Sequence, residues 1–354
     1  MAGTVVARFA NDEERSRWDA LVAANPAGGE VWSGDEYLEA KRHGRYRPYR
    51  VIVERGSDRP PLAVGVLVKR VPLLGEWWHL PAGPPGDTVE EVLEAAGAIA
   101  RLARSRGAFL MKIEPRIGPA AAPAIRAAGY RDAVRIIPNP STILVDVGGT
   151  EDEVFARLGK TARNSINRAR RDGIAAERVP ATDENCAALY RLLRETAEGR
   201  FVLRDERYYR EFWQRFENAG LGQLFFAVRD GELVAGAFAM ALGDKTTYKD
   251  GASLRTKTAY GASHALQWEV LRWANERGAR THDLCGAPPA AQADDTAHPL
   301  HGVGRFKRSF QPEITDYAGA FELPLKPRLA ALWAKIGDRL ARRWSLAVRK
   351  DPYY

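Results

Sequence analysis

Cysteine is scarce in this chain, which has only Cys186 and Cys285 among its 354 residues. The two lie far apart and show no Cys-x-x-Cys spacing, so no disulfide framework is indicated and a reducing cytoplasm is the expected compartment. Long apolar runs are also absent, because no window approaches the roughly 18 residues of a spanning helix. The first residues lack a basic region followed by an apolar core, so we expect no signal peptide. These absences predict a soluble cytoplasmic protein.

Common catalytic and nucleotide-binding motifs are missing as well. The patterns GxxxxGK[ST], GxSxG, HExxH and CxxC do not occur, which argues against P-loop nucleotide binding, serine hydrolysis and zinc catalysis. His282, Cys285, His298 and His301 are close in sequence, but their spacings match no zinc site. We therefore expect no metal.

Residues 298–310 form the densest cluster of functional side-chain types. Gly302 and Gly304 let the backbone approach a partner closely. Phe306 and Phe310 alternate there with three cations, Arg305, Lys307 and Arg308. This combination predicts a pocket for an anionic partner that has a flat or apolar part. The alternative is a turn leading into a buried strand, with the aromatic rings in the core and the cations in solvent.

The overall composition gives a general indication of which partners the protein binds. The 53 Lys and Arg against 45 Asp and Glu give a net charge of +8, which favours anionic partners such as nucleic acid, phosphorylated substrates or a membrane surface. The 45% hydrophobic and 28% charged residues are ordinary for a globular protein. At this length two domains are expected.

Weak internal repetition predicts how the two domains are built. Residues 63–67 are echoed by 234–238, and 105–108 by 276–279, both at an offset of 171. Each half reads as three strands, a long helix (about 88–105 and 260–277) and a further strand. The expected class is α/β (α+β), with two tandem domains of the acetyltransferase (GNAT) type whose mixed sheets are flanked by helices. We place these domains at residues 1–150 and 151–326, with a basic amphipathic helix over 327–354.

Two helical segments carry many cations. A helix is predicted from Glu151 to Ile174, with Thr150 as a candidate N-cap and Gly173 as a candidate C′ residue. In the C-terminal helix, apolar residues at helical spacing oppose seven cations and one acid, Asp338. Such a helix lies on an anionic membrane surface or simply packs on the body of the protein, and both interpretations stay open.

Coenzyme A binding is not supported by the sequence. An acyl-CoA enzyme of this fold has a loop of the form [RQ]xxGx[GA] at the start of the long helix. Residues 255–263, which precede the second long helix, lack that spacing, and residues 84–87 before the first contain no such loop. We therefore expect no cofactor.

Seven segments occur in an order that is informative as a whole. They are residues 32–41, 80–84, 112–115, 137–146, 161–169, 195–208 and 298–307. In this order the chain resembles, end to end, the Fem family of peptidoglycan-bridge aminoacyltransferases, which have two tandem acetyltransferase-type domains without a coenzyme A site. It departs from the family pattern at Ile137, where glutamine is usual, and at Gln311, where glycine is expected. The family's coiled-coil arm has no room between residues 173 and 183, and residues 287–297 read as a loop.

The resemblance implies a function. Such enzymes transfer an amino acid (glycine, alanine or serine) from aminoacyl-tRNA to a side-chain amine on the stem peptide of a peptidoglycan precursor, lipid II or UDP-MurNAc-pentapeptide. The acceptor side chain is lysine or diaminopimelate. The ester is already activated, so alignment and stabilisation of the oxyanion are the main requirements. Peripheral contact with the inner face of the cell membrane is compatible with a lipid-linked acceptor.

The resemblance also assigns roles to individual residues. Lys307 is expected to stabilise the oxyanion or to contact the ester and ribose, with Phe306 shaping its position. Lys41 and Arg204 are expected to bind the diphosphate of the precursor in a cleft between the domains. The remaining expected site residues are Tyr208 and Tyr248 in the substrate pocket, and Glu114 and Asp283 at strand ends as possible proton acceptors. For the last two, a structural role at the strand ends is the alternative.

Two other functions stay open at this point. One is an aminoacyltransferase of the same fold that uses tRNA and acts on a small antibiotic-like acceptor. The other is a non-catalytic protein that binds RNA or anionic lipid.

Overall fold

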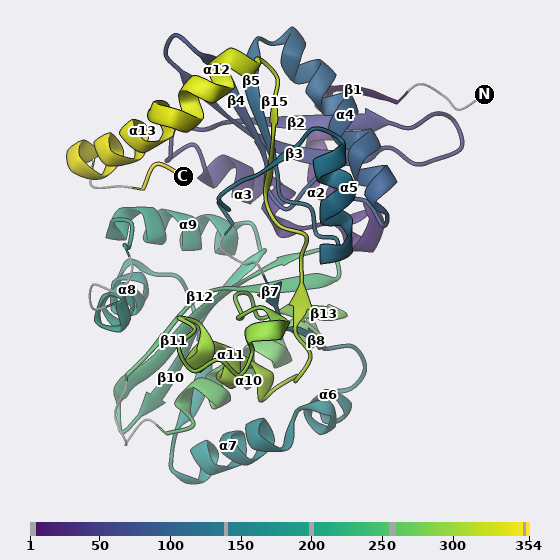
Figure 1. Ribbon diagram of the computed structural model, residues 1–354. Coiled ribbons are helices and arrows are strands. Elements are labelled where there is room, and N and C mark those ends of the chain that lie inside the picture. The colour runs from purple at the N-terminus through teal and green to yellow at the C-terminus, as the bar shows by residue number, and fades with distance from the viewer. Residues whose placement is uncertain (1–4, 138–140, 198–201, 255–259, 350–351) are drawn as a thin grey trace. The chain divides into compact units, whose positions relative to one another are not determined.

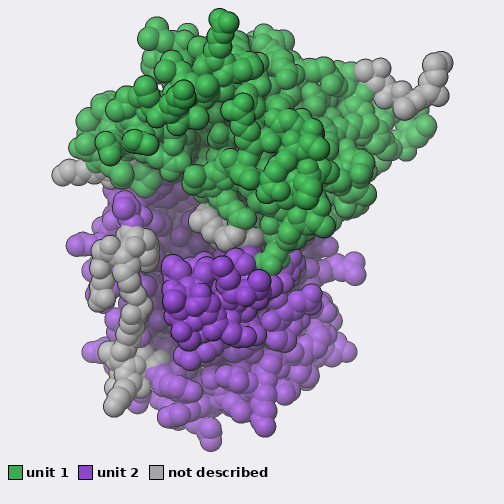
Figure 2. All heavy atoms as spheres, viewed as in Figure 1, with its two compact units in different colours: residues 1–140, 316–354 green, residues 141–315 purple. Residues whose placement is uncertain are grey.

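The computed structural model describes residues 5–137, 141–197, 202–254, 260–349 and 352–354 (Figure 1). Parts of three segments discussed above, residues 138–140, 198–201 and 255–259, lie outside the described residues. The chain divides into two compact units, one formed by residues 1–140 with 316–354 and the other by residues 141–315 (Figure 2). Each unit is described by itself below.

The first unit contains a seven-stranded sheet in the order β1-β2-β3-β4-β5-β15-β6. Its strands are β1 (Val6–Phe9), β2 (Arg47–Glu54), β3 (Leu62–Val71), β4 (Gly75–Leu80), β5 (Ala108–Ile113), β6 (Arg131–Asp132) and β15 (Phe321–Pro324). Its helices are α1 (Asp12–Ser16), α2 (Trp18–Ala23), α3 (Asp35–Ala40), α4 (Val89–Ser105), α5 (Ala122–Ala127), α12 (Pro327–Leu332) and α13 (Asp338–Trp344). Strands β4 and β5 are parallel, and the other paired neighbours for which a register is given are antiparallel. The predicted order of three strands, a long helix and a further strand is confirmed.

The second unit repeats this plan in a six-stranded sheet, ordered β8-β13-β12-β11-β10-β9. The six strands of this sheet are β8 (Leu144–Asp146), β9 (Ala175–Val179), β10 (Gly222–Arg229), β11 (Glu232–Leu242), β12 (Lys245–Ser253) and β13 (Thr281–Asp283), and β7 (Ser141–Thr142) belongs to a separate two-stranded sheet. Its helices are α6 (Glu151–Arg157), α7 (Lys160–Arg171), α8 (Asp183–Ala197), α9 (Glu206–Asn218), α10 (Ala262–Glu276) and α11 (His301–Arg308). Strand β14 (Thr315–Asp316) spans the boundary between the units. The predicted mixed-sheet α/β class with tandem GNAT-type halves is thus confirmed.

The unit boundaries differ from the predicted domains at both ends. Residues 144–146 form β8 and pair antiparallel with β13, so they belong to the second sheet. Residues 321–324 form β15 and pair antiparallel with β5, so the chain returns to the first sheet. Helix α12 then packs against β5 rather than forming a separate region. Local patterns do not reveal these pairings, because strand partners distant in sequence decide them.

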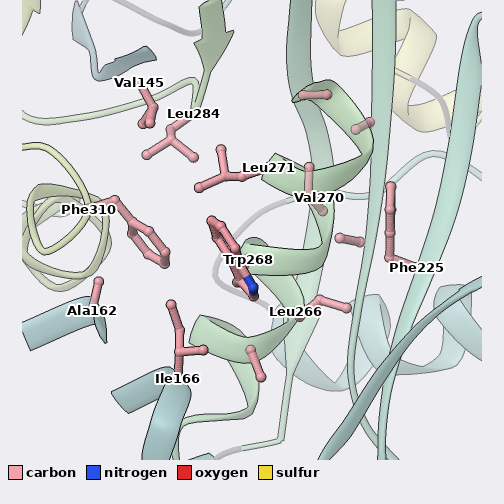
Figure 3. Packing of buried hydrophobic residues seen from close by; sticks show 14 of the residues in the cluster. Val145, Ala162, Ile166, Phe225, Leu266, Trp268, Val270, Leu271, Leu284 and Phe310 are labelled. Carbon is pink, nitrogen blue, oxygen red and sulfur yellow. The ribbon is translucent and has the colours of Figure 1, made fainter. Parts of the chain in front are cut away.

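Both faces of the second sheet are covered, as the alternation of its strand residues requires. Phe225 faces α10 and packs edge-on against Trp273, with ring centroids 5.8 Å apart. Phe238 faces α9, where its ring lies 6.2 Å from that of Phe212. Trp268 and Phe310 belong to the core on the α10 side (Figure 3). In the first unit α4 covers one face with small residues that include Ala95 and Ala103.

The predicted helix from residue 151 to 174 is broken into α6 and α7. Thr150 is confirmed as the N-cap, with a capping box that includes Glu153. Leu158 is extended and buried, and Gly159 begins the second helix. A Cβ atom on Gly159 would lie 2.3 Å from the carbonyl oxygen of Ser309, so the close approach of these segments requires glycine and interrupts the helix. Near the N-terminus, α1 and α2 are likewise separate helices that meet at Arg17.

Residues 301–308 form helix α11, so the alternative prediction of a turn leading into a strand is wrong. The predicted C-terminal helix is present over residues 327–349, as α12, α13 and two π-helical turns. Among the helices that the structure describes, none combines the length and the apolar character needed to cross a membrane.

Candidate functional site

Lys307 is the centre of the site in the second unit. Its side chain is buried, and its ammonium donates hydrogen bonds to the main-chain carbonyls of Cys285 and Gly286, the latter at 3.0 Å. The ring of Tyr248 lies near the same ammonium, 5.7 Å from ring centroid to Nζ. A buried cation is thus held at the end of β13 by main-chain oxygens and an aromatic ring.

The backbone after β13 is shaped to present those two carbonyls. Cys285 and Gly286 both have positive φ, at 52° and 48°. Asp283 supports the turn, because one carboxylate oxygen accepts the Cys285 N–H at 2.7 Å and also the hydroxyl of Thr142. Asp283 therefore lies beside the Lys307 site as a structural anchor of its carbonyl ligands.

Burial changes the acidity of Lys307. Removal from water disfavours the ammonium and lowers the pKa of Lys307 from 10.5 to about 8, while nearby Asp283 and Cys285 act in the opposite direction. Tyr248 is partly buried, and its removal from water raises the pKa of its phenol. At neutral pH the site therefore combines a positive Lys307 with a neutral Tyr248.

Phe306 lies beside Lys307 in sequence but lines a different space. A pocket of about 680 Å³ is lined by four residues of α11, Gly302, Arg305, Phe306 and Arg308, and by its C-cap Ser309. Lys307 is not among its lining residues. The two residues that were predicted to act together thus have different surroundings. Phe306 lines the pocket, and Lys307 binds the carbonyls after β13.

The pocket has the chemistry of an anion site with an aromatic wall. Its other lining residues come from α7, from the start of α10 and from the segment after α11, and they are Thr161, Ser165, Tyr260, Gly261, Ser263, His264 and Pro312. Gly261 is the N-cap of α10 and, as a glycine, offers no side chain to cap the first N–H groups of that helix. Both Gly261 and Ser263 line the pocket, so the positive end of the α10 dipole lies beside it. Arg305 and Arg308 add positive charge.

Sequence reasoning missed the contribution of His264. Its ring packs against Phe306 at 4.9 Å and stacks on Phe310 at 5.4 Å, and one ring nitrogen lies 3.2 Å from the hydroxyl of Ser309. Burial lowers the pKa of His264 to about 4, so the ring is neutral at physiological pH. The sequence signal that could have identified His264 is its position in the first turn of the long helix.

The two other predicted residues of the second unit lie together. The guanidinium of Arg204 lies 4.8 Å from the ring centroid of Tyr208. Asp205 caps α9 by accepting the Tyr208 N–H at 2.8 Å, and the Tyr190 hydroxyl donates to the Arg204 carbonyl at 3.0 Å. A cation and a phenol are thereby fixed at the start of α9.

The first unit holds the remaining two predicted residues. Lys41 follows α3 as its C-cap, and its ammonium lies 5.0 Å from the ring centroid of Tyr37. Glu114 follows β5 and accepts main-chain N–H groups of Ile136 at 2.6 Å and Ile137 at 3.1 Å. Like Asp283, it anchors backbone after the last strand of the repeat.

Comparison with known proteins finds one domain model and several sequence relatives. An acetyltransferase (GNAT) domain model matches residues 156–308. The lipid II:glycine glycyltransferase of Staphylococcus epidermidis is 21% identical over 92% of this chain and 94% of its own length, and that of Staphylococcus aureus is 21% identical over 92% and 97%.

Solved structures agree in fold. The crystal structure of FemX matches with a TM-score of 0.76 and 19% identity, covering 92% of this chain and 99% of that chain. The C-terminal domain of a putative lysylphosphatidylglycerol synthetase from Agrobacterium fabrum matches with a TM-score of 0.54 and 17% identity, covering 93% and 97%. With the domain model, these matches show a fold of two tandem GNAT-type domains, and the glycyltransferase relatives agree with the predicted resemblance to the Fem family.

Proposed function

We propose that this protein transfers an amino acid from aminoacyl-tRNA to the stem-peptide side-chain amine of a peptidoglycan precursor. The observation that carries the proposal is Lys307, a buried cation at the end of β13 in a chain that matches lipid II:glycine glycyltransferases over nearly their whole length. Glycine is the first amino acid to test because it is in the relatives' name, and alanine and serine follow.

The reaction requires few catalytic groups from the protein. The acceptor amine attacks the ester carbonyl, a C–N bond forms, the C–O bond to the ribose breaks, and the ribose oxygen leaves as a hydroxyl with the proton that the amine gives up. Negative charge develops on the carbonyl oxygen between these events. A preorganised cation in a buried site stabilises that charge more strongly than it would in water. Lys307 fills this role.

The pocket beside α11 suits the phosphate-bearing end of the donor. Phosphate groups bind well at a helix N-terminus, and Gly261 leaves the N-terminus of α10 without a side-chain cap. Arg305 and Arg308 add charge, and Phe306 with His264 offers rings against which a base can stack. This donor requires no coenzyme A, in line with the missing pyrophosphate loop before α10.

On the acceptor side, Lys41 and Arg204 are proposed as ligands of the precursor's diphosphate. Both cations lie next to tyrosine rings, Tyr37 and Tyr208, which restrict their rotamers. Arg204 has the planar fork that suits phosphate oxygens, and Lys41 contributes a point charge. Tyr248 is proposed to complete the pocket near Lys307.

A lipid-linked acceptor is favoured by the C-terminal helix. Five apolar residues recur there every fourth position and are 48–63% exposed, namely Leu332, Ile336, Leu340, Trp344 and Val348. Cations stand beside this row, and five of them are Arg328, Lys335, Arg339, Arg342 and Arg343. An exposed apolar row flanked by cations fits an anionic bilayer surface. We propose a cytoplasmic protein that contacts the inner face of the membrane through this row.

The test is a transfer assay. Purified protein is incubated with tRNA charged with radiolabelled glycine, alanine or serine, and with lipid II or UDP-MurNAc-pentapeptide. Label is expected in the precursor, reduced about 100-fold or more in Lys307→Ala and less strongly in Lys41→Ala or Arg204→Ala. Lys326→Ala, which removes an exposed lysine of the first unit, is the matched control and should retain activity.

Two results would redirect the proposal. If folded protein transfers no label to either precursor, the acceptor is a small antibiotic-like molecule or the protein only binds RNA or anionic lipid. Full activity in Lys307→Ala would remove Lys307 from the mechanism.

A further inference from the structure

Helix α7 carries cations that the proposed transfer reaction does not use. It contains Lys160, Arg163, Arg168, Arg170 and Arg171 and no acidic residue. Helix α9, which has a similar length and lies in the same unit, contains three arginines and three glutamates. Charges of both signs are typical of a helix surface that faces only solvent, so the single sign of α7 indicates an anionic partner.

One side of α7 is used for packing. The helix packs against α10, and Ala162 and Ile166 point into the core toward Trp268 and Phe310 (Figure 3). In Figure 1, α7 lies at the margin of the second unit. Its remaining surface is therefore available to a partner.

Four exposed residues share the side of α7 that is turned away from the core. Lys160, Asn164, Asn167 and Arg171 follow one another at spacings of four, three and four residues, and each is exposed. We call these four residues the α7 face. The rise of an α-helix separates Lys160 from Arg171 by about 16 Å along the axis, so the two cations can reach different charges of an extended anion.

The α7 face adjoins the pocket beside α11. Thr161 and Ser165, which are also residues of α7, line that pocket. The guanidinium of Arg168 lies 4.4 Å from the ring centroid of Tyr260, a lining residue that is 53% exposed. One nitrogen of Arg168 contacts Asp172 at 3.4 Å, and a guanidinium has further N–H groups. Because Arg168 lies three residues before Arg171, it connects the pocket edge with the α7 face.

The side chains of the α7 face distinguish between classes of anionic partner. A membrane surface favours exposed apolar residues beside cations, as in the C-terminal helix, whereas all four residues here are polar or charged. Single-stranded nucleic acid favours aromatic rings, which belong to the pocket rather than to the α7 face. Double-stranded RNA is recognised through its phosphates and ribose hydroxyls, which suit cations and amide side chains. The α7 face therefore fits the backbone of an RNA duplex.

We infer that the α7 face binds the base-paired stem of a tRNA whose unpaired 3′ end enters the pocket beside α11. Lys160 and Arg171 contact phosphates, and Asn164 and Asn167 contact phosphates or ribose hydroxyls. This inference rests on the proposed function, in which the donor is aminoacyl-tRNA. It assigns a surface to the duplex part of the donor, which the pocket is too small to hold.

The test measures RNA binding without any transfer. Fluorescence anisotropy of the full-length protein compares an uncharged tRNA with the same tRNA from which the unpaired 3′ end has been removed. In Lys160→Gln with Arg171→Gln, the affinity for both RNAs is expected to fall about tenfold, because two phosphate contacts are lost. The steepness with which log Kd rises with log salt concentration should decrease by about two, one for each cation removed.

Arg191→Gln with Arg194→Gln is the matched control. Both arginines are exposed on α8, which packs against α9 on the other face of the second sheet. This variant loses the same charge as the α7 variant and should bind both RNAs like the wild type. Thermal unfolding of the two double variants checks that each is folded, as expected for exposed positions.

The outcomes separate this inference from the proposed function. Unchanged tRNA affinity in the α7 variant, an equal loss in the α8 control, or a loss confined to the intact tRNA would each overturn the inference and leave the transfer reaction in place. Retained tRNA affinity with lost sedimentation on anionic vesicles would overturn it in favour of a membrane surface.

Two further results bear on both proposals. A wild-type protein that binds no tRNA would overturn the inference together with the proposed function. Weaker tRNA binding in the α7 variant of a protein that transfers no amino acid would support the α7 face and count against the transfer reaction.

Discussion

The ammonium of Lys307 donates a hydrogen bond to the main-chain carbonyl of Gly286 at 3.0 Å, from a position that is almost closed to solvent. The residues are 21 positions apart, and the turn that presents this carbonyl is supported by Asp283. The cation is therefore oriented by backbone rather than by a flexible counter-ion. This arrangement has consequences for pH dependence and for stability.

Transfer should follow a bell-shaped pH profile. The acceptor amine must be neutral, which favours high pH, while Lys307 must be protonated, which fails above its pKa of about 8. In Lys307→Arg the alkaline limb should disappear, because a guanidinium stays charged over this range. Initial rates from pH 6 to 10 check this, and an unchanged alkaline limb in Lys307→Arg would assign it to another group.

Stability should also respond to this lysine. The folded-state pKa of about 8 lies below the ordinary 10.5, so between these values the unfolded chain holds a proton that the folded protein has released. The wild type should gain up to about 3 kcal/mol relative to Lys307→Met as pH rises through this window. Denaturant unfolding of both proteins at pH 7.5 and 10.5 measures the difference. A gap that does not change with pH would mean that Lys307 is not buried as a cation.

Two glycine substitutions should have opposite effects on stability. Gly159→Ala places a methyl group against the carbonyl oxygen of Ser309 and should cost about 1–3 kcal/mol. Gly302→Ala in α11 meets nothing within 4 Å and should be neutral or stabilising by up to about 1 kcal/mol. Thermal unfolding of the pair checks this expectation, which fails if both variants unfold like the wild type.

Gly302→Ala should nevertheless impair transfer, because its new methyl group projects from a residue that lines the α11 pocket. We expect a higher KM for aminoacyl-tRNA with little change in KM for the precursor. A stable Gly302→Ala protein with wild-type kinetics would show that the donor does not enter this pocket.

Membrane contact should depend on the exposed row of the C-terminal helix. Ile336 and Leu340 are 52% and 57% exposed, so Ile336→Glu with Leu340→Glu should leave stability within about 0.5 kcal/mol per site. Co-sedimentation with anionic vesicles should be lost in this double variant. Leu73→Glu, at a fully exposed apolar residue of the first unit, is the control that should still sediment. Deleting the helix is less informative, because Trp333 is buried against Phe109.

Much of the fold was predictable because its signals are local. The long helices predicted over about 88–105 and 260–277 occur as α4 and α10, and the strands that follow them occur as β5 and β13. Periodic apolar residues and caps such as Thr150 are properties of a few neighbouring residues, so they can be read without knowing the fold. The resemblance to the Fem family came from the order of short motifs, which is also a property of the linear chain.

For the candidate site, the sequence predicted which types of side chain are present but not how they are arranged. The motif at residues 298–307 indicated a cationic, aromatic pocket, and α11 does line one. Phe306 faces this pocket, whereas Lys307 binds the carbonyls after β13. This difference depends on how α11 is rotated about its own axis. Local sequence does not encode that rotation, because the packing partners come from distant segments such as the turn after β13.

By itself, then, the sequence determined the class, the doubled order of elements, and the types of side chain available for chemistry. Only the tertiary structure decided where the units divide, since β8 and β15 find partners distant in the chain. It also decided the acidity of Lys307, because burial and the nearness of Asp283 arise only when remote segments pack together.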